Sequence, residues 1–327
     1  MNTTPLVSFR SHIRNLIRKG ENIWRRLLRG GAMFFCLWAV STYFGYSDFL
    51  SNNWIIVGVS LVCCFLPMSA GALVLGVYIV LQLLSLAMDI AGTVLLLFAL
   101  AYIFAGSYQA KHFLHFGGIA ALYQVHIPFF APLWGGLFGG MQEVCTIIAG
   151  STISYYLKLV RDASPQLLST DEPISSLNIL QGMFSNPMFY IFLTAMITMF
   201  VIISFVRNLS IPHSWLVAVF VGTLAEFVIM TGGYIFIDGR ERIPELAVTS
   251  LIVLAIGAVL YFIFQDLDYA RIERVQFEDD DYYYYVKAVP KIRLAMEDKQ
   301  VVNITAEEPE QEPEPEQPDE ERSTSEE

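Results

Sequence analysis

Charged side chains are scarce in this sequence. They make up 16% of the 327 residues, whereas soluble domains carry about 25%. The four cysteines form no Cys-x-x-Cys pair and have no histidine at ligand spacing, which predicts neither a zinc centre nor a disulfide framework. The sequence also lacks a Gly-x-x-x-x-Gly-Lys-Ser/Thr nucleotide-binding motif and any Ser/His or paired-Asp constellation. We therefore expect no enzymatic activity, no cofactor and no metal ion.

No basic patch with interleaved aromatic residues occurs, so we also expect no nucleic-acid partner. The net charge of −11 belongs mainly to one end of the chain, because residues 306–327 hold 11 acids and one arginine. The rest of the chain has 20 acids against 19 bases. From residue 307 onward the composition is low-complexity Glu, Pro and Gln, which is too polar to bury a core. We expect residues 293–327 to form a disordered acidic tail.

Apolar residues, by contrast, are abundant: 55% of the chain is hydrophobic and the mean hydropathy is +0.51. One run of 53 residues, from Trp54 to Gly106, is interrupted only by hydroxyls, Gln82 and Asp89. Because a hydrocarbon core about 30 Å thick needs roughly 20 apolar residues per helix, this run alone predicts two or three transmembrane helices. The fold class is therefore predicted to be an all-α polytopic transmembrane helix bundle, embedded in a lipid bilayer over residues 31–265.

Eight spans are predicted, or nine if the long run divides near Asp89. Their ranges are 32–46, 54–65, 72–106, 113–130, 133–157, 188–206, 214–237 and 246–264. Pro67 should end or kink a helix. The short second segment therefore either crosses and continues past the kink or returns as a re-entrant segment packed against protein.

The first 30 residues carry seven bases and one acid, which predicts a cytoplasmic N-terminus. Apolar residues recur in residues 1–30 at three- and four-residue steps. This segment is therefore either an amphipathic helix in the headgroup layer or a basic start that only fixes orientation.

Two β-prone runs follow the last span, on either side of an acidic turn at residues 279–281. They predict a short β-hairpin within residues 266–292. Eight spans would return this segment to the cytoplasm, whereas nine would leave it outside. The loop charges alone do not decide between these alternatives.

The sequence of residues 275–291 contains Phe-Glu-Asp-Asp, a run of tyrosines and Val-Lys-Ala-Val-Pro-Lys. In this segment the chain resembles a family of uncharacterised bacterial multi-pass membrane proteins that are often labelled permeases of ATP-binding-cassette (ABC) transporters. His126-Ile127-Pro128 followed by a Gly-rich helix supports the resemblance. The resemblance implies a bacterial inner-membrane protein with a cytoplasmic C-terminus, and it favours eight spans. The chain departs from the family by its acidic Glu-Pro tail, since the family's short tails are usually basic.

Three carboxylates inside apolar segments are the candidate ion- or substrate-binding residues: Asp89, Glu143 and Glu226. A carboxylate at mid-bilayer costs several kcal/mol (about 2.5 or more) unless it is protonated, paired or hydrated, so it tends to persist where it has a task. Each also fits a structural role. Asp89 fits a helix end in the headgroup layer, and the two glutamates fit packing or hydrogen bonds between helices.

Two function classes remain. The first is a transporter or permease subunit for a small solute or ion, in which helices broken at Pro67 and at residues 128–140 line a central site with Glu143 and Glu226. The alternative is a noncatalytic membrane scaffold that recruits a partner protein through residues 275–291.

Overall fold

The computed structural model describes residues 21–107, 115–167, 175–264, 273–278 and 283–288. These residues form eleven α-helices, one 3₁₀ helix and two strands. The elements are α2 (Glu21–Phe44), α3 (Asn53–Cys63), α4 (Met68–Leu84), α5 (Met88–Ser107), α6 (His115–Gln124), α7 (Phe130–Phe138), α8 (Glu143–Leu167), α9 (Ser176–Ser185), α10 (Pro187–Val206), α11 (Ser214–Phe236), η1 (Arg240–Arg242), α12 (Ile243–Phe264), β1 (Glu273–Glu278) and β2 (Tyr283–Ala288).

Four of the described helices are long and apolar enough to cross a membrane. They cover Arg26–Phe44, Pro187–Val206, Ser214–Phe236 and Arg240–Phe264. Three shorter apolar helices cover Asn53–Cys63, Ser69–Leu84 and Met88–Phe104. Many large apolar side chains of these helices are exposed, for example Leu251 at 63% and Leu96 at 60%. The helical fold is thus confirmed and is consistent with a membrane protein, whereas the count of eight spans stays a prediction.

Several predicted spans are not single helices, because glycines or short turns interrupt them. The run 72–106 is two helices, α4 and α5, separated by a turn at residues 85–87. The single span predicted over residues 133–157 is wrong, because Gly139 adopts an extended conformation (φ −89°, ψ −179°) that ends α7 before α8 begins. The span predicted over residues 113–130 likewise contains α6 and the turn that precedes α7. Near Pro67 the prediction holds: α3 ends at Cys63, and Pro67 is the N-cap of α4.

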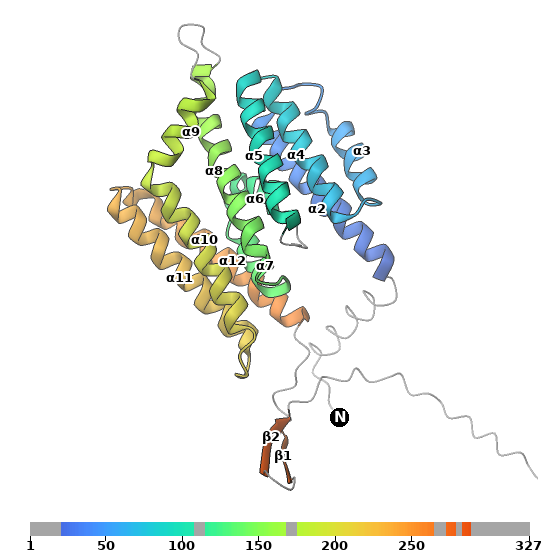
Figure 1. Ribbon diagram of the computed structural model, residues 1–327, viewed down its shortest axis with the longest axis vertical. Coiled ribbons are helices and arrows are strands. Elements are labelled where there is room, and N and C mark those ends of the chain that lie inside the picture. Colours follow the sequence, from blue (N-terminus) through green and yellow to red (C-terminus); the bar gives the residue numbers. More distant parts are fainter. Residues whose placement is uncertain (1–20, 108–114, 168–174, 265–272, 279–282, 289–327) are drawn as a thin grey trace, which may run out of the picture. The chain divides into compact units, whose positions relative to one another are not determined.

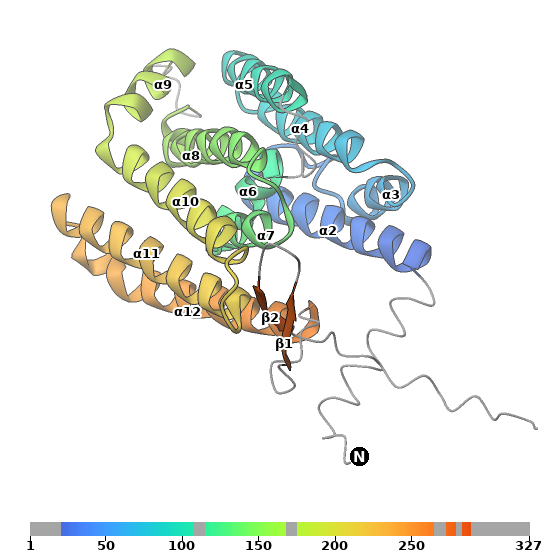
Figure 2. The same ribbon diagram turned by 60° about the horizontal axis from the view of Figure 1, so that its bottom comes forward.

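The long helices are arranged around α8. Figures 1 and 2 show α10, α11 and α12 on one side of α8 and α2 to α5 on the other, with α6 and α7 between them. Small residues allow close packing in the first group. Gly136 of α7 and Gly222 of α11 both contact Ile203 of α10, which is fully buried between them.

Contacts between helices give their relative directions. Gly222 and Gly233 of α11 lie beside Ile203 and Ile191 of α10, so these two helices are antiparallel. At one end of the bundle, Arg207, just after α10, contacts the last turn of α7. We call this the Arg207 end. At the opposite end, Asp89 in the first turn of α5 contacts the start of α9, and we call this the α9 end.

Helices α6 and α7 are short and run in opposite directions. Gln124, at the end of α6, is hydrogen-bonded to Arg161 in the last third of α8, so α6 runs toward the α9 end. Phe129, just before α7, packs against Phe192 near the start of α10, whereas the last turn of α7 lies beside Arg207. The chain therefore turns within residues 125–129, beside α8 and α10.

Strands β1 and β2 pair antiparallel, with Val275 opposite Val286 and Phe277 opposite Tyr284. The predicted turn at residues 279–281, the basic segment up to residue 20 and the predicted tail 293–327 lie outside the described residues.

Candidate functional site

Asp89 holds two helices together at the α9 end. Its side chain is exposed, and its Oδ2 accepts the backbone N–H of Ser176 at 2.9 Å. Ser176 is the first residue of α9, where the backbone N–H groups have no partner within the helix. A carboxylate at this position also interacts favourably with the helix dipole. The geometry therefore supports the helix-end interpretation of Asp89.

Glu143 is the first residue of α8, at the Arg207 end, and only 1% of its surface is exposed. The hydroxyl of Thr146 donates to the backbone carbonyl of Glu143 at 2.8 Å and lies 3.3 Å from its carboxylate. Leu137 and Gly139 come shortly before Glu143 in the sequence. Their backbone carbonyls accept hydrogen bonds from the guanidinium of Arg207, the one to Gly139 at 2.5 Å. Burial lowers the pKa of Arg207, but the ordinary pKa of arginine is so high that the side chain stays charged. Arg207 thus caps the C-terminus of α7.

Glu226 is completely buried in the middle of α11. Its Oε2 accepts a hydrogen bond of 3.1 Å from the hydroxyl of Ser250 on α12. Met230 lies one helical turn farther along α11, on the same face of that helix. It lines a cavity that opens between α11, α12 and the α6–α7 turn.

The structure does not bring the three carboxylates together. Asp89 lies at the α9 end, Glu143 at the Arg207 end, and Glu226 between them on a different pair of helices. The cavity lies beside Lys158, which is 15 residues after Glu143 on α8. At 1.5 Å per residue this separates Glu143 from the cavity by about 22 Å.

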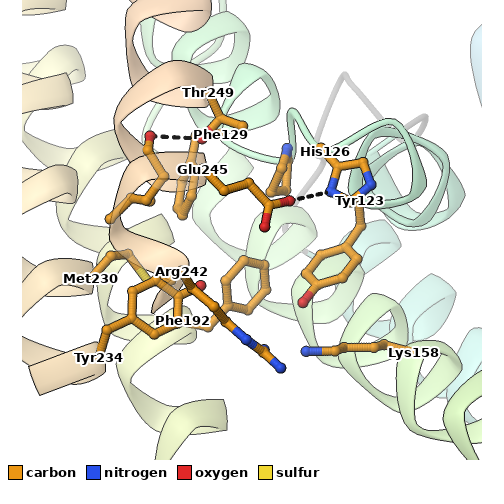
Figure 3. Close-up of a pocket in the computed structure, with 12 residues that line it drawn as sticks. Tyr123, His126, Phe129, Lys158, Phe192, Met230, Tyr234, Arg242, Glu245 and Thr249 are labelled. Carbon is orange, nitrogen blue, oxygen red and sulfur yellow. Dashed lines mark hydrogen bonds and ion pairs between the residues drawn. The ribbon is translucent and has the colours of Figure 1, made fainter. Parts of the chain in front are cut away.

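The cavity has a volume of about 340 Å³ and is lined by six helical segments and one turn (Figure 3). Its lining residues are Tyr123, His126, Pro128, Phe129, Lys158, Phe192, Met230, Tyr234, Arg242, Glu245, Leu246 and Thr249. The apolar part of the lining is buried, with Phe129 and Phe192 each only 3% exposed. The charged residues form its more exposed part. The cavity is therefore amphipathic, with an apolar floor and a polar mouth.

Two cations point toward each other across this cavity, the ammonium of Lys158 and the guanidinium of Arg242 (Figure 3). Lys158 Nζ lies 5.7 Å from the ring centre of Tyr123 and 5.6 Å from that of Tyr155, which are cation–π distances. Arg242 belongs to η1, and its charge acts on Lys158, as do the opposite charges of Asp162 and Glu245. The two tyrosine rings thus hold the ammonium of Lys158 at the mouth.

The other polar pair at the mouth is His126 and Glu245, whose Nδ1 and Oε1 are 2.8 Å apart. Their side chains are 65% and 58% exposed. His126 has a left-handed backbone conformation (φ 63°), which turns the chain from α6 toward α7. Pro128 follows in the same turn and fixes the direction of the chain before α7. The turn thereby places His126 next to the first turn of α12.

Sequence reasoning missed most of the cavity. Residues 128–140 were expected to be a broken helix lining a site, and Pro128 and Phe129 do line the cavity. The sequence pattern singles out none of the charged residues Lys158, Arg242 and Glu245. Their sequence signal is weak, because each stands at the edge of an apolar segment, where charges are ordinary. The break at Pro67 contributes no residue to the cavity.

Comparisons with known proteins add no relative: no protein-family model matches the chain, and no curated protein or solved structure matches it. The resemblance to bacterial permease-like proteins therefore stays a prediction.

Proposed function

We propose that this protein is a multi-pass membrane carrier for a small solute and that the cavity beside the α6–α7 turn is its binding site. The observation that carries the proposal is the position of the cavity. It lies at the turn between the two short helices α6 and α7, among the long helices α8, α10, α11 and α12. In membrane proteins, interrupted helices are tolerated where they are buried or line a cavity, and carriers use them to form binding sites.

The depth of the cavity fits this role. Phe192, in its floor, is 14 residues from Val206 at the Arg207 end of α10, which corresponds to about 21 Å. It is five residues from Pro187 at the α9 end, or about 8 Å. A solute in the cavity would therefore lie inside the bilayer but closer to one surface.

The proposed topology has eight crossings: α2, α3, α4, α5, α8, α10, α11 and α12. The 11 residues of α3 measure about 16 Å, so this crossing also includes the turns on either side of the helix. Helices α6 and α7 run in opposite directions, so counting them as crossings would leave the parity even. The bases near the start of the chain place the N-terminus, and hence the Arg207 end, in the cytoplasm. Strands β1 and β2 are then cytoplasmic as well, and the cavity faces the outer half of a bacterial inner membrane.

Glu226 is the proposed coupling residue. It lies one helical turn below the cavity wall formed by Met230, and Ser250 connects it to the helix that carries Glu245. A buried carboxyl that can gain and lose a proton is what a carrier coupled to protons or cations needs. Glu143 and Asp89 lie away from the cavity and hold helix ends in this proposal.

A labelling experiment that does not depend on the solute tests the proposal. In a variant whose four native cysteines (Cys36, Cys63, Cys64 and Cys145) are replaced by alanine, Thr249→Cys places one thiol in the cavity wall. We expect a membrane-impermeant maleimide to modify it both in intact cells and in inverted vesicles, because a carrier exposes its site to each side in turn.

The matched control is Ser185→Cys at the end of α9, which is exposed and outside the cavity. It should react in intact cells only. If Thr249→Cys also reacts from one side only, the cavity is not an alternating-access site and the carrier proposal is wrong.

The scaffold alternative draws support from the strands β1 and β2. A two-stranded ribbon is marginally stable by itself, so a partner protein bound to residues 275–291 would stabilise it. Deleting residues 273–288 should leave two-sided labelling of Thr249→Cys intact if the protein is a carrier. The scaffold would be favoured by a phenotype that is lost on deletion of these residues and that no substitution in the cavity changes.

A further inference from the structure

The charges that line the cavity do not balance. Lys158 and Arg242 are both cationic, and Glu245 is the one carboxylate in the lining. That carboxylate is already engaged by His126 at 2.8 Å. Among the described residues, no carboxylate lies within 4 Å of the charged atoms of Lys158 or Arg242. Asp162, one turn after Lys158, is exposed and outside the lining.

We infer that the cavity binds a small organic anion, and this inference deepens the carrier function proposed above. The charged group of the anion lies between Lys158 and Arg242, and its apolar part packs against Phe129, Phe192 and Met230. A guanidinium presents a planar set of donors that matches a carboxylate or phosphate, and an ammonium adds a point charge. An anion between the two cations also removes their mutual repulsion.

The size and the floor of the cavity restrict the ligand further. Its volume of about 340 Å³ lies near the lower end of ligand pockets, which span roughly 300–1,000 Å³. Phe129 and Phe192 form an edge-to-face pair with ring centres 5.9 Å apart, and this pair presents aromatic surface to the ligand. A monophosphate or carboxylate joined to one ring satisfies both ends of the cavity. An inorganic ion leaves the floor uncovered.

A phosphate can reach this site from solution or as part of a lipid headgroup, and we assign it to the free solute. The test uses the full-length protein in nanodiscs of zwitterionic phosphatidylcholine, titrated calorimetrically with phenyl phosphate. Benzyltrimethylammonium and benzyl alcohol serve as the cationic and neutral probes of similar size. We expect phenyl phosphate to bind at least about tenfold more tightly than either, the effect of one charge-assisted hydrogen bond.

Substitutions locate the binding. Arg242→Gln and Lys158→Gln should each weaken phenyl phosphate binding by between about tenfold and hundredfold. The matched control is Arg240→Gln, which removes the same charge two residues earlier in η1, from a side chain that is 72% exposed and outside the lining. It should change the affinity by less than about twofold, because an exposed charge is screened by solvent.

A charge-reversed variant distinguishes loss of binding from loss of folding. Arg242→Glu should lose phenyl phosphate binding and gain affinity for benzyltrimethylammonium, which an unfolded protein would not do. Equal binding of the three probes, equal loss in Arg240→Gln and Arg242→Gln, or no binding of phenyl phosphate would overturn the inference. Binding that disappears in nanodiscs of anionic phosphatidylglycerol, at unchanged ionic strength, would assign the site to a lipid headgroup and overturn the free-solute assignment.

The two proposals fail separately. If phenyl phosphate binds as expected but Thr249→Cys is labelled from one side only, the anion site stands and the carrier function is wrong. If the thiol is labelled from both sides but none of the probes distinguishes Arg242→Gln from wild type, the carrier stands and the anion site is wrong.

Discussion

Replacing Gly222 by alanine tests the packing that positions the wall of the cavity. A Cβ atom at position 222 would lie 2.5 Å from Cγ1 of Ile203 and 3.0 Å from its Cδ1. Carbon atoms prefer separations of about 3.5–4.0 Å, so α10 and α11 would have to separate or Ile203 would have to move. Ile203 cannot easily move away, because its Cβ and Cγ2 face Gly136 of α7, and a β-branched side chain has one strongly preferred rotamer in a helix.

Gly232 on the same helix is the matched control, since a Cβ there would meet no atom within 4 Å. Both Gly→Ala changes gain the same helix propensity of about 0.5–1 kcal/mol, which cancels in the comparison. The difference that remains is the overpacking term, about 1–3 kcal/mol. We therefore expect Gly222→Ala to be less stable than Gly232→Ala by that amount.

Reversible unfolding in mixed detergent micelles, with sodium dodecyl sulfate as denaturant and tryptophan fluorescence as the signal, measures this difference. Ile203→Ala in the Gly222→Ala background should remove the clash, so the two changes should couple favourably by about 0.5–3 kcal/mol in a double-mutant cycle. Equal stability of the two alanine variants, or a coupling energy of zero, would show that α10 and α11 are not in the close contact described here.

Three other changes have defined outcomes. Arg207→Gln should lose at least about 1.5 kcal/mol in the same assay, because two charge-assisted hydrogen bonds to the end of α7 disappear, and Arg207→Lys should recover only part of it. An unchanged midpoint would exclude the cap. Asp89→Ala should speed hydrogen exchange of the first amides of α9, since it removes the acceptor of the Ser176 N–H. Exchange at the wild-type rate would contradict that role. Glu226→Gln keeps an acceptor for Ser250, so it should unfold within about 0.5 kcal/mol of wild type while changing the two-sided labelling of Thr249→Cys.

The sequence predicts the last three long helices to within a few residues. The ranges 188–206, 214–237 and 246–264 correspond to α10, α11 and α12, which begin at Pro187, Ser214 and Ile243. These helices are predominantly apolar, and polar or charged residues separate them. For such segments, hydropathy alone gives the boundaries.

Hydropathy fails at residues 113–157, where the chain remains apolar but the backbone does not remain helical. The left-handed conformation of His126 and the extended conformation of Gly139 divide this stretch into α6, α7 and α8. Neither break interrupts the apolar character of the stretch, because most of the turn residues are small or apolar. Tertiary contacts stabilise the breaks, as when Arg207 caps α7, and such contacts are invisible in a local pattern.

The burial of Glu143 and Glu226 follows from their apolar neighbours in the sequence, and both side chains are at most 1% exposed. Their neighbours across the bundle could not be predicted. The Glu226–Ser250 hydrogen bond joins residues 24 positions apart, and the contact between Asp89 and α9 joins residues 87 positions apart. The same limitation hid Lys158 and Arg242, whose common cavity exists only once α8 and η1 are packed together.

The free-energy cost of burying the Glu226 carboxyl relates the interior of the bundle to this cavity. A carboxyl in the middle of an apolar helix destabilises the protein relative to a leucine of similar size, and the hydroxyl of Ser250 offsets only part of that cost. A protein that needed α11 only for packing would be more stable with the apolar residue. The cavity described above lies one turn away, past Met230, and its lining includes the cations Lys158 and Arg242. In the proposed carrier, an ionised Glu226 and a bound anion would repel each other across that turn, so anion binding and proton uptake are expected to be linked.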